Sequence, residues 1–479
     1  MERLSGLDAS FLYLETPSQV MSVAAIVVID PSTIPGGYTF EGLRREMGRR
    51  VSGLPVLRRK LADSMTNVDH PVWVEDEGFD IERHVHRIAI PEPGTIDEMA
   101  QTCGHLVGQV LDRKKPLWDL WVLEGMADGN LVLVLRIHHA CVDGATVAEI
   151  LDELATASPE APTLDAMRVA ETAGGASRSD IAVAGAFNYF LQRPIAALKL
   201  IPKTLPVPFD WIKRARGGDG MPAPFVAPRT PFNAPLTTRR SLAFANMPLD
   251  DLKRIKNHFD VKLNDVVLAM AGGALRAYLE ERGELPDAPL VGMIPVSVRS
   301  AEENDLIEAG TNKVSGMFTR LATTSADPVE RIRLAGEYAN QSKDHHQGID
   351  ANILRAYAEF APGQALGSLM RMYTDRQMSG MHPPVFNAII SNVAGPNRPM
   401  YVLGGRVTAV YPMGPIFHGL GLNITVISVD GMLNVGLLSC PDLVSDLWDL
   451  VNGFQTQLDE LLAVVAADLE KQDDEVTGE

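Results

Sequence analysis

LVLVLRIHHACVDG, residues 131–144, is the stretch that decides the fold of this chain. Its first seven residues are aliphatic on both faces and rich in β-branched side chains, which is typical of a central, buried strand. Beyond the polar residues, the apolar positions recur at helical spacing: Val147, Ile150, Leu151 and Leu154. The two histidines therefore lie where a buried strand meets a helix.

The pair His138-His139 has chemical and structural interpretations. Adjacent residues of an extended backbone point to opposite sides, so the two rings cannot easily share a metal ion, and we expect no metal site. An imidazole titrates near neutral pH and suits a general base that takes a proton from a hydroxyl group. An alcohol that attacks a thioester needs only such a base and a stabiliser for the oxyanion. Alternatively, the pair is an ordinary one and Asp143 only caps a helix over 145–154.

Composition and motifs exclude several other classes of protein. The net charge of −18 over 479 residues argues against nucleic-acid binding. Neither a GxSxG elbow nor a glycine-rich phosphate loop is present. Three scattered cysteines without a CxxC pair indicate no disulfide framework and no zinc site, so a reducing cytoplasm is expected. No apolar run reaches the roughly 18 residues of a membrane span, and the start carries no signal-peptide core.

The length predicts two domains, and a change of composition divides them. We assign residues 1–155 to the first domain, 156–235 to a partly helical crossover rich in Pro, Gly, Ala and Ser, and 236–465 to the second domain. The charged tail 466–479 is expected to be disordered. Apolar patterns predict a helix at 265–281 and strands at 21–29, 289–298, 384–391, 404–411, 421–429 and 432–438.

The crossover carries a local charge opposite to that of the whole chain. Residues 193–216 hold six basic side chains against the one acid Asp210, a local charge of +5. Large apolar residues are interleaved with them over 183–216. Such a segment predicts peripheral contact with a membrane or lipid droplet. Alternatively, the apolar residues pack on the second domain and the basic ones are solvated.

The residues 138–144 fit HHxxxDG, the signature of the coenzyme A-dependent acyltransferase superfamily. From residue 4 to about 465, the chain resembles the bacterial wax ester synthase/diacylglycerol acyltransferase family, of the triacylglycerol synthase type. The resemblance rests on blocks that occur in the family's order: LSGLDASFLYLETP (4–17), 79–94, 111–126, PRTPFNAPLTTRR (228–240), 263–279, MIPVSVR (293–299), SNVAGP (391–396) and GLGLNIT (419–425).

The resemblance implies an α/β, two-domain fold like that of chloramphenicol acetyltransferase, with mixed sheets and a tunnel between the domains. Acyl-CoA would enter as co-substrate from one face, and a diacylglycerol or long-chain alcohol from the other, with no further cofactor. The cysteine pattern and the crossover predict a cytoplasmic protein, peripheral on the inner membrane surface or lipid droplets. Triacylglycerol and wax ester remain open as the main product.

The same resemblance assigns roles to individual residues. His139 would be the base, with His138 and Asp143 holding it in place. Separately from the resemblance, we expect Asp143 to pair with a cation inside the fold, and Arg299 is the candidate. Substrate-binding roles fall on Trp118, Gly144, Asn264, Asp265, Asn392 and Gly421.

Each of these assignments has a structural alternative. Trp118 would belong to a packed turn, Asn264 and Asp265 would cap the helix at 265–281, and Asn392 would belong to a turn that closes the seam with Gly395 and Pro396. Gly419 and Gly421 would allow close backbone approach. We expect Cys141 to serve packing. The remaining paired histidines are interpreted as surface or loop residues: His84, His86, His345 and His346.

Two other functions compete with this one. One is a condensation-like transferase that takes its acyl group from a carrier protein, although no carrier-protein serine motif or fused module is visible in the sequence. The other is a non-catalytic lipid-binding paralogue, against which the intact HHxxxDG speaks.

Overall fold

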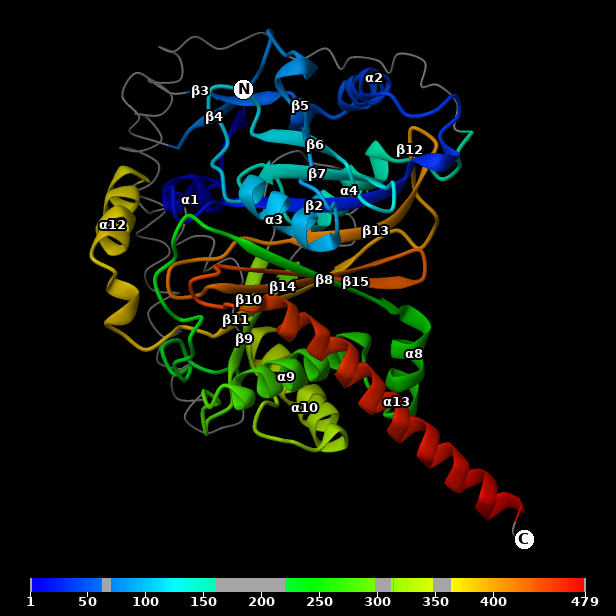
Figure 1. Cartoon of the computed structure of the whole chain (residues 1–479). Coiled ribbons are helices and arrows are strands. Elements are labelled where there is room, and N and C mark those ends of the chain that lie inside the picture. The colour runs from blue at the N-terminus through cyan, green and yellow to red at the C-terminus, as the bar shows by residue number, and fades with distance from the viewer. Residues whose placement is uncertain are drawn as a thin grey trace.

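The computed structural model describes residues 2–62, 70–160, 220–297, 312, 314–347 and 363–477. The described residues form two lobes, each built around a six-stranded mixed sheet with helices packed on it (Figure 1). This confirms the predicted two-domain α/β class. Most of the predicted crossover, residues 161–219, lies outside the described residues, so its predicted membrane contact is not tested here.

The first sheet contains the strand that ends in the histidines. Its order is β12 (Tyr401–Val402), β13 (Gly405–Met413), β2 (Ser22–Asp30), β7 (Leu131–His138), β6 (Trp118–Glu124) and β5 (Val85–Ala89). Only β5 and β6 pair in parallel; the other neighbours are antiparallel. Every residue of β7 is buried, as its two-sided apolar pattern predicts.

Helices cover both faces of this sheet. The alternation of side chains along β2 and β7 sends one set into a core with α2 (Phe40–Val51) and α4 (Gly144–Leu154), and the other set into a core with α3 (Ile96–Val107). Beyond the first of these cores lies a small sheet, in the order β1 (Glu2–Arg3), β4 (Val72–Glu75) and β3 (Arg59–Ala62).

The second sheet has the order β10 (Val314–Arg320), β9 (Val291–Ser297), β11 (Ala388–Ala394), β14 (Leu422–Val429), β15 (Met432–Ser439) and β8 (Ser241–Pro248). β11 pairs in parallel with β9 and β14, and the other pairs are antiparallel. Its helices lie on the side away from the first lobe: α8 (Leu249–His258), α9 (Leu263–Glu281), α10 (Pro328–Gln347) and α13 (Leu447–Thr477) (Figure 1).

Residues 401–413 differ from the predicted domain division. The strand expected near 404–411 forms as β13, but it pairs with β2 of the first sheet, from Arg406 opposite Asp30 to Met413 opposite Ala24. β13 then passes over the second sheet so closely that a Cβ on Gly436 of β15 would lie 2.2 Å from the carbonyl oxygen of Pro412. The second half of the chain thus completes the first lobe.

The C-terminal segment also differs from the prediction. α13 continues to Thr477, whereas the sequence pattern predicts a disordered tail from residue 466. The buried residues Leu458, Leu461 and Val465 anchor the preceding turns. Since the Ala, Glu, Lys and Gln residues that follow are strong helix formers, the helix extends beyond its anchored part.

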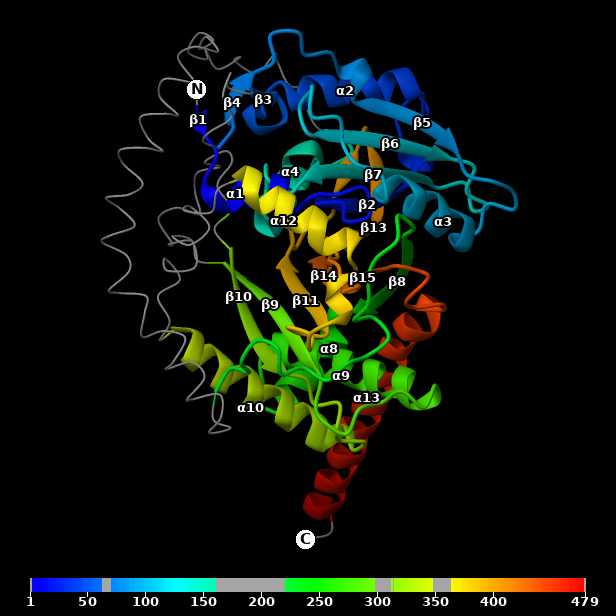
Figure 2. The same cartoon turned by 90° about the vertical axis from the view of Figure 1, so that its left-hand side faces the viewer.

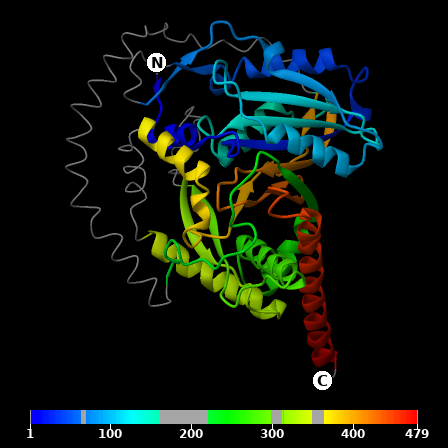
Figure 3. The same ribbon diagram turned by 60° about the vertical axis from the view of Figure 1, so that its left-hand side comes forward.

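Two further helices lie where the lobes meet. α1 (Gly6–Leu14) is capped at its N-terminus by Ser5, whose side chain accepts a hydrogen bond from the amide of Asp8. α12 (Gly363–Asp375) packs against α1, and Figures 2 and 3 show the two side by side at the junction of the lobes. Among the described helices, none combines the length and the apolar character needed to cross a bilayer.

Candidate active site

His138 is the last residue of β7, and His139 follows it in a turn. The backbone amide of His138 donates to Leu117 O (2.9 Å) and that of His139 to Met21 O (2.8 Å). Their rings contact different residues: Glu15 lies next to His138, and Phe11 and Asn312 lie next to His139. The His138 ring is fully buried, whereas His139 is only partly buried and stacks on Phe11 of α1, with ring centroids 4.1 Å apart.

His138 is held by a buried carboxylate that the sequence analysis missed. Its Nδ1 accepts a hydrogen bond from the amide of Ala140 (3.0 Å), so its proton must lie on Nε2. That nitrogen lies 3.3 Å from Oε1 of Glu15, the C-terminal cap of α1. Glu15 also accepts from the amide of Met21 (3.3 Å) and from Arg113 (2.9 Å). His138 thus fastens the end of β7 to the end of α1.

His139 has the opposite tautomer. Its Nδ1 lies 3.1 Å from Oδ1 of Asn312, which can only accept, so Nδ1 carries the proton and donates it. Nε2 is left with a free lone pair, which is the form a general base requires. Burial lowers the pKa of His139 below its ordinary 6.5, and the hydrogen bond of the ring to its own backbone, the charge of Asp143 and the bond to Asn312 oppose this only in part. The ring is therefore neutral at pH 7.

Asp143 performs the structural task predicted for it. Its Oδ1 accepts from the amide (3.0 Å) and the hydroxyl (2.8 Å) of Thr146, and it caps α4. Arg299 lies outside the described residues, so the pairing of Asp143 with Arg299 stays a prediction. Cys141 is buried, and its burial raises the pKa of the thiol to about 12. It therefore stays protonated and unreactive, which agrees with the packing role expected.

Trp118 is a core residue in the structure. It is 2% exposed, its indole Nε1 donates to Leu57 O (2.6 Å), and its ring stacks on His84 at 4.5 Å. The packing alternative fits this position, and the substrate-binding assignment gains no support from it.

His84 lies in a turn, as the loop interpretation expects, but it is not at the surface. His84 is buried, its Nδ1 donates to Trp118 O (2.8 Å), and burial lowers its pKa to about 4. The interpretation of His345 as a surface or loop residue is wrong. His345 lies buried on α10, where Nδ1 accepts from the amide of Met221 (3.0 Å). Both rings are satisfied by backbone partners, which short histidine pairs in a sequence do not reveal.

Asn264 and Asp265 open α9, which starts two residues earlier than predicted. Asp265 is buried and accepts from the amide of Lys262 (2.9 Å), so it stabilises the first turn as the capping alternative expects. Oδ1 of Asn264 lies 3.5 Å from Nδ2 of Asn392. Asn392 belongs to β11 and not to a turn. The structure thus pairs two of the predicted substrate residues with each other.

The predicted glycines mark close approaches. A Cβ on Gly144 would touch Val393 of β11 at 3.5 Å, which places the N-terminus of α4 against the second sheet. After β11, a Cβ on Gly395 would lie 2.4 Å from Ser428 O. Gly421 donates its amide to Phe232 O (2.8 Å). The close approach expected at Gly421 is therefore present, and it packs the segment around Phe232 against the start of β14.

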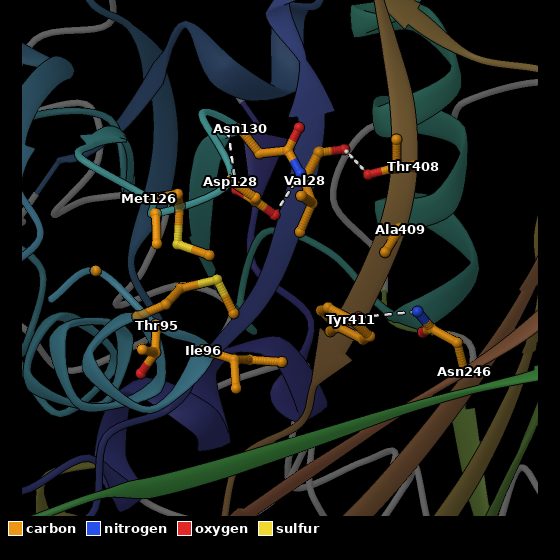
Figure 4. A pocket seen from close by; sticks show the side chains of 13 residues that line it. Val28, Thr95, Ile96, Met126, Asp128, Asn130, Asn246, Thr408, Ala409 and Tyr411 are labelled. Carbon is orange, nitrogen blue, oxygen red and sulfur yellow. Dashed lines mark hydrogen bonds between the residues drawn. The ribbon is translucent and has the colours of Figure 1, made fainter.

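A cavity of about 450 Å³ lies elsewhere, between the first sheet, α3 and β8 (Figure 4). Tyr411 and Asn246 point toward each other in it and share a hydrogen bond of 3.0 Å. Its wall includes Val28. On the same strand, Ser22 is the partner of His138. Six residues of strand separate the two by roughly 20 Å, so this cavity is distinct from the histidine site.

The residues that the sequence analysis missed include a stripe on α1. Asp8, Phe11 and Glu15 recur at i, i+3 and i+7 and so share a helix face, which was the available signal. Asn312 gave no such signal, since it lies 173 residues from His139 in a segment without periodicity. Among the described residues, no group of three or more His, Cys, Asp or Glu side chains is placed to hold a metal ion.

Comparison with known proteins identifies the family. Residues 4–267 match the model of the wax ester synthase/diacylglycerol acyltransferase catalytic domain, and residues 310–462 match that of the family's C-terminal domain. The chain belongs to this family. A Mycobacterium tuberculosis H37Rv relative, named "Putative diacyglycerol O-acyltransferase Rv1760", is 43% identical over 96% of this chain and 90% of its own. A second one from that strain, named in the same way with the designation Rv3087, is 32% identical over 98% of each chain.

Solved structures support the fold of this acyltransferase. The wax ester synthase/diacylglycerol acyltransferase of Marinobacter aquaeolei VT8 superposes with a TM-score of 0.68 at 24% identity, over 97% of this chain and 100% of that one. The first condensation domain of the calcium-dependent antibiotic synthetase gives 0.56 at 15% identity, over 97% and 96%. At these identities the likeness concerns the fold alone. The chain is an acyltransferase of the wax ester synthase/diacylglycerol acyltransferase family.

Proposed function

We propose that this acyltransferase moves a fatty acyl group from acyl-CoA to the hydroxyl group of a diacylglycerol or a long-chain alcohol, with His139 as general base. The products are triacylglycerol and wax ester, respectively. The observation that carries the proposal is the tautomer of His139, since the bond from Nδ1 to Asn312 leaves Nε2 free to accept a proton. The low pKa caused by burial keeps this nitrogen unprotonated at neutral pH.

The reaction then needs no covalent enzyme intermediate. Nε2 of His139 takes the hydroxyl proton while the oxygen attacks the thioester carbonyl carbon. A C–O bond forms, and a tetrahedral oxyanion results. When it collapses, the C–S bond breaks, and the departing thiolate receives the proton from the imidazolium ring. The base is restored, and coenzyme A leaves as a free thiol.

The acyl donor separates this proposal from its main competitor, the condensation-like transferase. The fold neighbours include both a wax ester synthase/diacylglycerol acyltransferase and condensation domains, so the fold favours neither donor. The two Mycobacterium tuberculosis relatives are named as putative diacylglycerol O-acyltransferases, which favours the ester product. An apolar tunnel between the lobes and peripheral contact with lipid through residues 183–216 belong to the same proposal, because acceptor and product are insoluble in water.

Purified protein tests the proposal. Palmitoyl-CoA is offered with dipalmitoylglycerol or with hexadecanol, and free thiol release is followed together with product chromatography. Release of thiol that depends on the acceptor, with matching ester, is expected. Transfer only from palmitoyl carrier protein would support the condensation-like alternative. Binding of palmitoyl-CoA without turnover with any acceptor would support the lipid-binding one.

A further inference from the structure

Asn312 contacts His139 at two points. Its Oδ1 accepts the Nδ1 proton (3.1 Å), and its Nδ2 donates to the backbone oxygen of the same histidine (2.7 Å). One amide group therefore bonds to both the ring and the backbone of His139, and rotation of the ring would break the bond to Nδ1. Phe11 closes one face of the imidazole at 4.1 Å. The ring is held in direction and in plane.

The orientation of this amide is itself fixed by Asp8. Oδ1 of Asp8 accepts from both the backbone amide (2.9 Å) and Nδ2 (2.5 Å) of Asn312. A flipped amide would place its oxygen against a carboxylate oxygen and against a carbonyl oxygen, so the flip is excluded. Because of this, Asn312 presents an acceptor to the imidazole, and only the Nδ1-protonated tautomer of His139 fits.

Asp8 has the contacts of an ionised carboxylate. It is fully buried, and every hydrogen bond described for its carboxylate comes from a donor: the two of Asn312, and Ser5 through its hydroxyl (2.7 Å) to Oδ2. Burial raises the pKa of Asp8 above its ordinary 3.8, and the hydrogen bonds from Ser5 and Asn312 oppose this by favouring the charged form. In a site of low dielectric this charge favours an imidazolium ring on the other side of the amide.

We propose that Asp8 and Asn312 are positioning residues of the reaction, which select the tautomer of His139 and stabilise the imidazolium that forms when it takes the proton. This inference rests on the proposed function. The neutral amide of Asn312 separates Asp8 from His139. A carboxylate in direct contact with the ring would raise the resting pKa of His139 and favour its protonated form. The charge of Asp8 acts from one residue further away.

Three variants separate orientation, charge and simple packing. Asn312→Ala removes the acceptor, Asp8→Asn keeps the shape and removes the charge, and Asn434→Ala is the control. Asn434 is also buried, and its Nδ2 also bonds to backbone oxygens. Oδ1 of Asn434 accepts from the amide of Val410, which pairs with Val27 on β2. On the same strand, Ser22 pairs with His138, and the five residues between Val27 and Ser22 span about 16 Å. Asn434 is therefore remote from the histidine site.

Two measurements are made on each variant: kcat and KM with palmitoyl-CoA and an acceptor, and the imidazole nitrogen resonances of His139 in protein labelled with ¹⁵N-histidine. The His139→Ala spectrum assigns the signals. Wild type should show protonated Nδ1 and unprotonated Nε2. Asn312→Ala should show a mixture of tautomers and lose about 100-fold or more in kcat, since misplacement of a reacting group by about 1 Å costs roughly that factor.

Asp8→Asn should keep the wild-type tautomer, lower kcat and move the acidic limb of the rate profile to lower pH. A purely structural residue would leave that limb in place. Asn434→Ala should change neither resonances nor kcat. The inference is overturned if Asn312→Ala keeps both the tautomer and kcat within twofold of wild type, or if Asp8→Asn leaves kcat and the limb unchanged. If the inference is overturned in this way but His139→Ala is inactive, the proposed function still holds. If His139→Ala is active, the proposed function itself is contradicted.

Discussion

At the scale of the residue, His139 owes its chemistry to its neighbours. Packing on Phe11 removes water from the ring, and Asn312 fixes the position of its proton. The cap at Asp143 could be predicted from its residue type. The partners Asn312 and Asp8 could not, because they reach the histidine through folding and not through local sequence.

The pH dependence of kcat/KM follows from the lowered pKa of His139. Protonation of Nε2 removes the lone pair, so activity should fall as pH drops through the pKa of the folded protein. Burial places that pKa below 6.5. More than half of the plateau value should therefore remain at pH 6.5. A rate profile with its acidic midpoint at or above 6.5 would show that the base is more exposed, or a different group.

Glu15 should stabilise the fold through His138. Burial raises the pKa of Glu15, but the hydrogen bonds and charges of His138 and Arg113 outweigh it and hold the pKa below its ordinary 4.5. Glu15→Gln should lower the free energy of unfolding at pH 7 by about 1–3 kcal/mol, the range for a bond to a charged group. The deficit should shrink as pH falls through the pKa of Glu15, since a protonated carboxyl resembles an amide.

Denaturant unfolding of Glu15→Gln, His138→Ala and the double variant measures the coupling. Glu280→Gln serves as the control, because this exposed carboxylate pairs with Arg276 on the surface of a helix and its loss should cost less than about 1 kcal/mol. Effects of Glu15→Gln and His138→Ala that simply add, within about 0.5 kcal/mol, would show that the two residues do not act together.

At the scale of the element, the local sequence pattern predicts which segments form helices and strands, but it does not predict which distant strands pair. The buried strand β7, the helix α9 and four strands of the second sheet, β9, β11, β14 and β15, follow from periodicity and apolar content, whereas β8 and β10 were not predicted. The sheet to which β13 belongs could not be predicted from its sequence pattern. Its partner β2 lies about 380 residues away in sequence, and only the assembled first lobe offers that edge. In α13, the charged C-terminal turns suggest disorder locally, yet they continue a helix that is anchored elsewhere.

The crossing of β13 over β15 can be tested at Gly436. Gly436→Ala would place a methyl group 2.2 Å from the backbone oxygen of Pro412, so one strand must move, at about 1–3 kcal/mol. Gly316→Ala in the edge strand β10 is the matched control, since its Cβ meets Met293 at an ordinary 3.6 Å. We expect Gly436→Ala to lower the free energy of unfolding and Gly316→Ala to leave it almost unchanged. Equal stability of the two would show that the strands do not cross this closely.

At the scale of the whole molecule, the two lobes share strands and side chains. β13 completes the first sheet from the second half of the chain, and Asn312, just before β10, completes the histidine site of the first lobe. The family and the class of fold could be read from ordered sequence blocks. The site could be read only in part, because its positioning residues come from both halves of the chain.

Membrane association is a prediction at this scale. The chain is acidic overall, with a net charge of −18, but residues 193–216 carry +5. In flotation with anionic liposomes, wild type should float and should lose binding as salt rises, because each basic residue near the surface contributes about 1 kcal/mol. A variant with glutamine at Lys199, Lys203, Lys213, Arg214 and Arg216 should remain at the bottom of the gradient.

The matched control for flotation removes five positive charges from the described surface: Lys114, Lys253, Arg254, Lys256 and Lys471, each changed to glutamine. It has the same net charge as the first variant and should float like wild type. If the first variant floats as well as the control, residues 193–216 are not the lipid contact.

The central claim is that His139 is the base of an acyl transfer, and steady-state kinetics of purified His139→Ala tests it most directly. Thiol release from palmitoyl-CoA is measured with the acceptor that wild type prefers, and unfolding curves check that the fold is unchanged. Loss of a general base predicts kcat/KM about 10²–10⁴-fold below wild type, with the unfolding midpoint preserved. A folded variant that keeps more than about a tenth of the wild-type kcat/KM would contradict the claim.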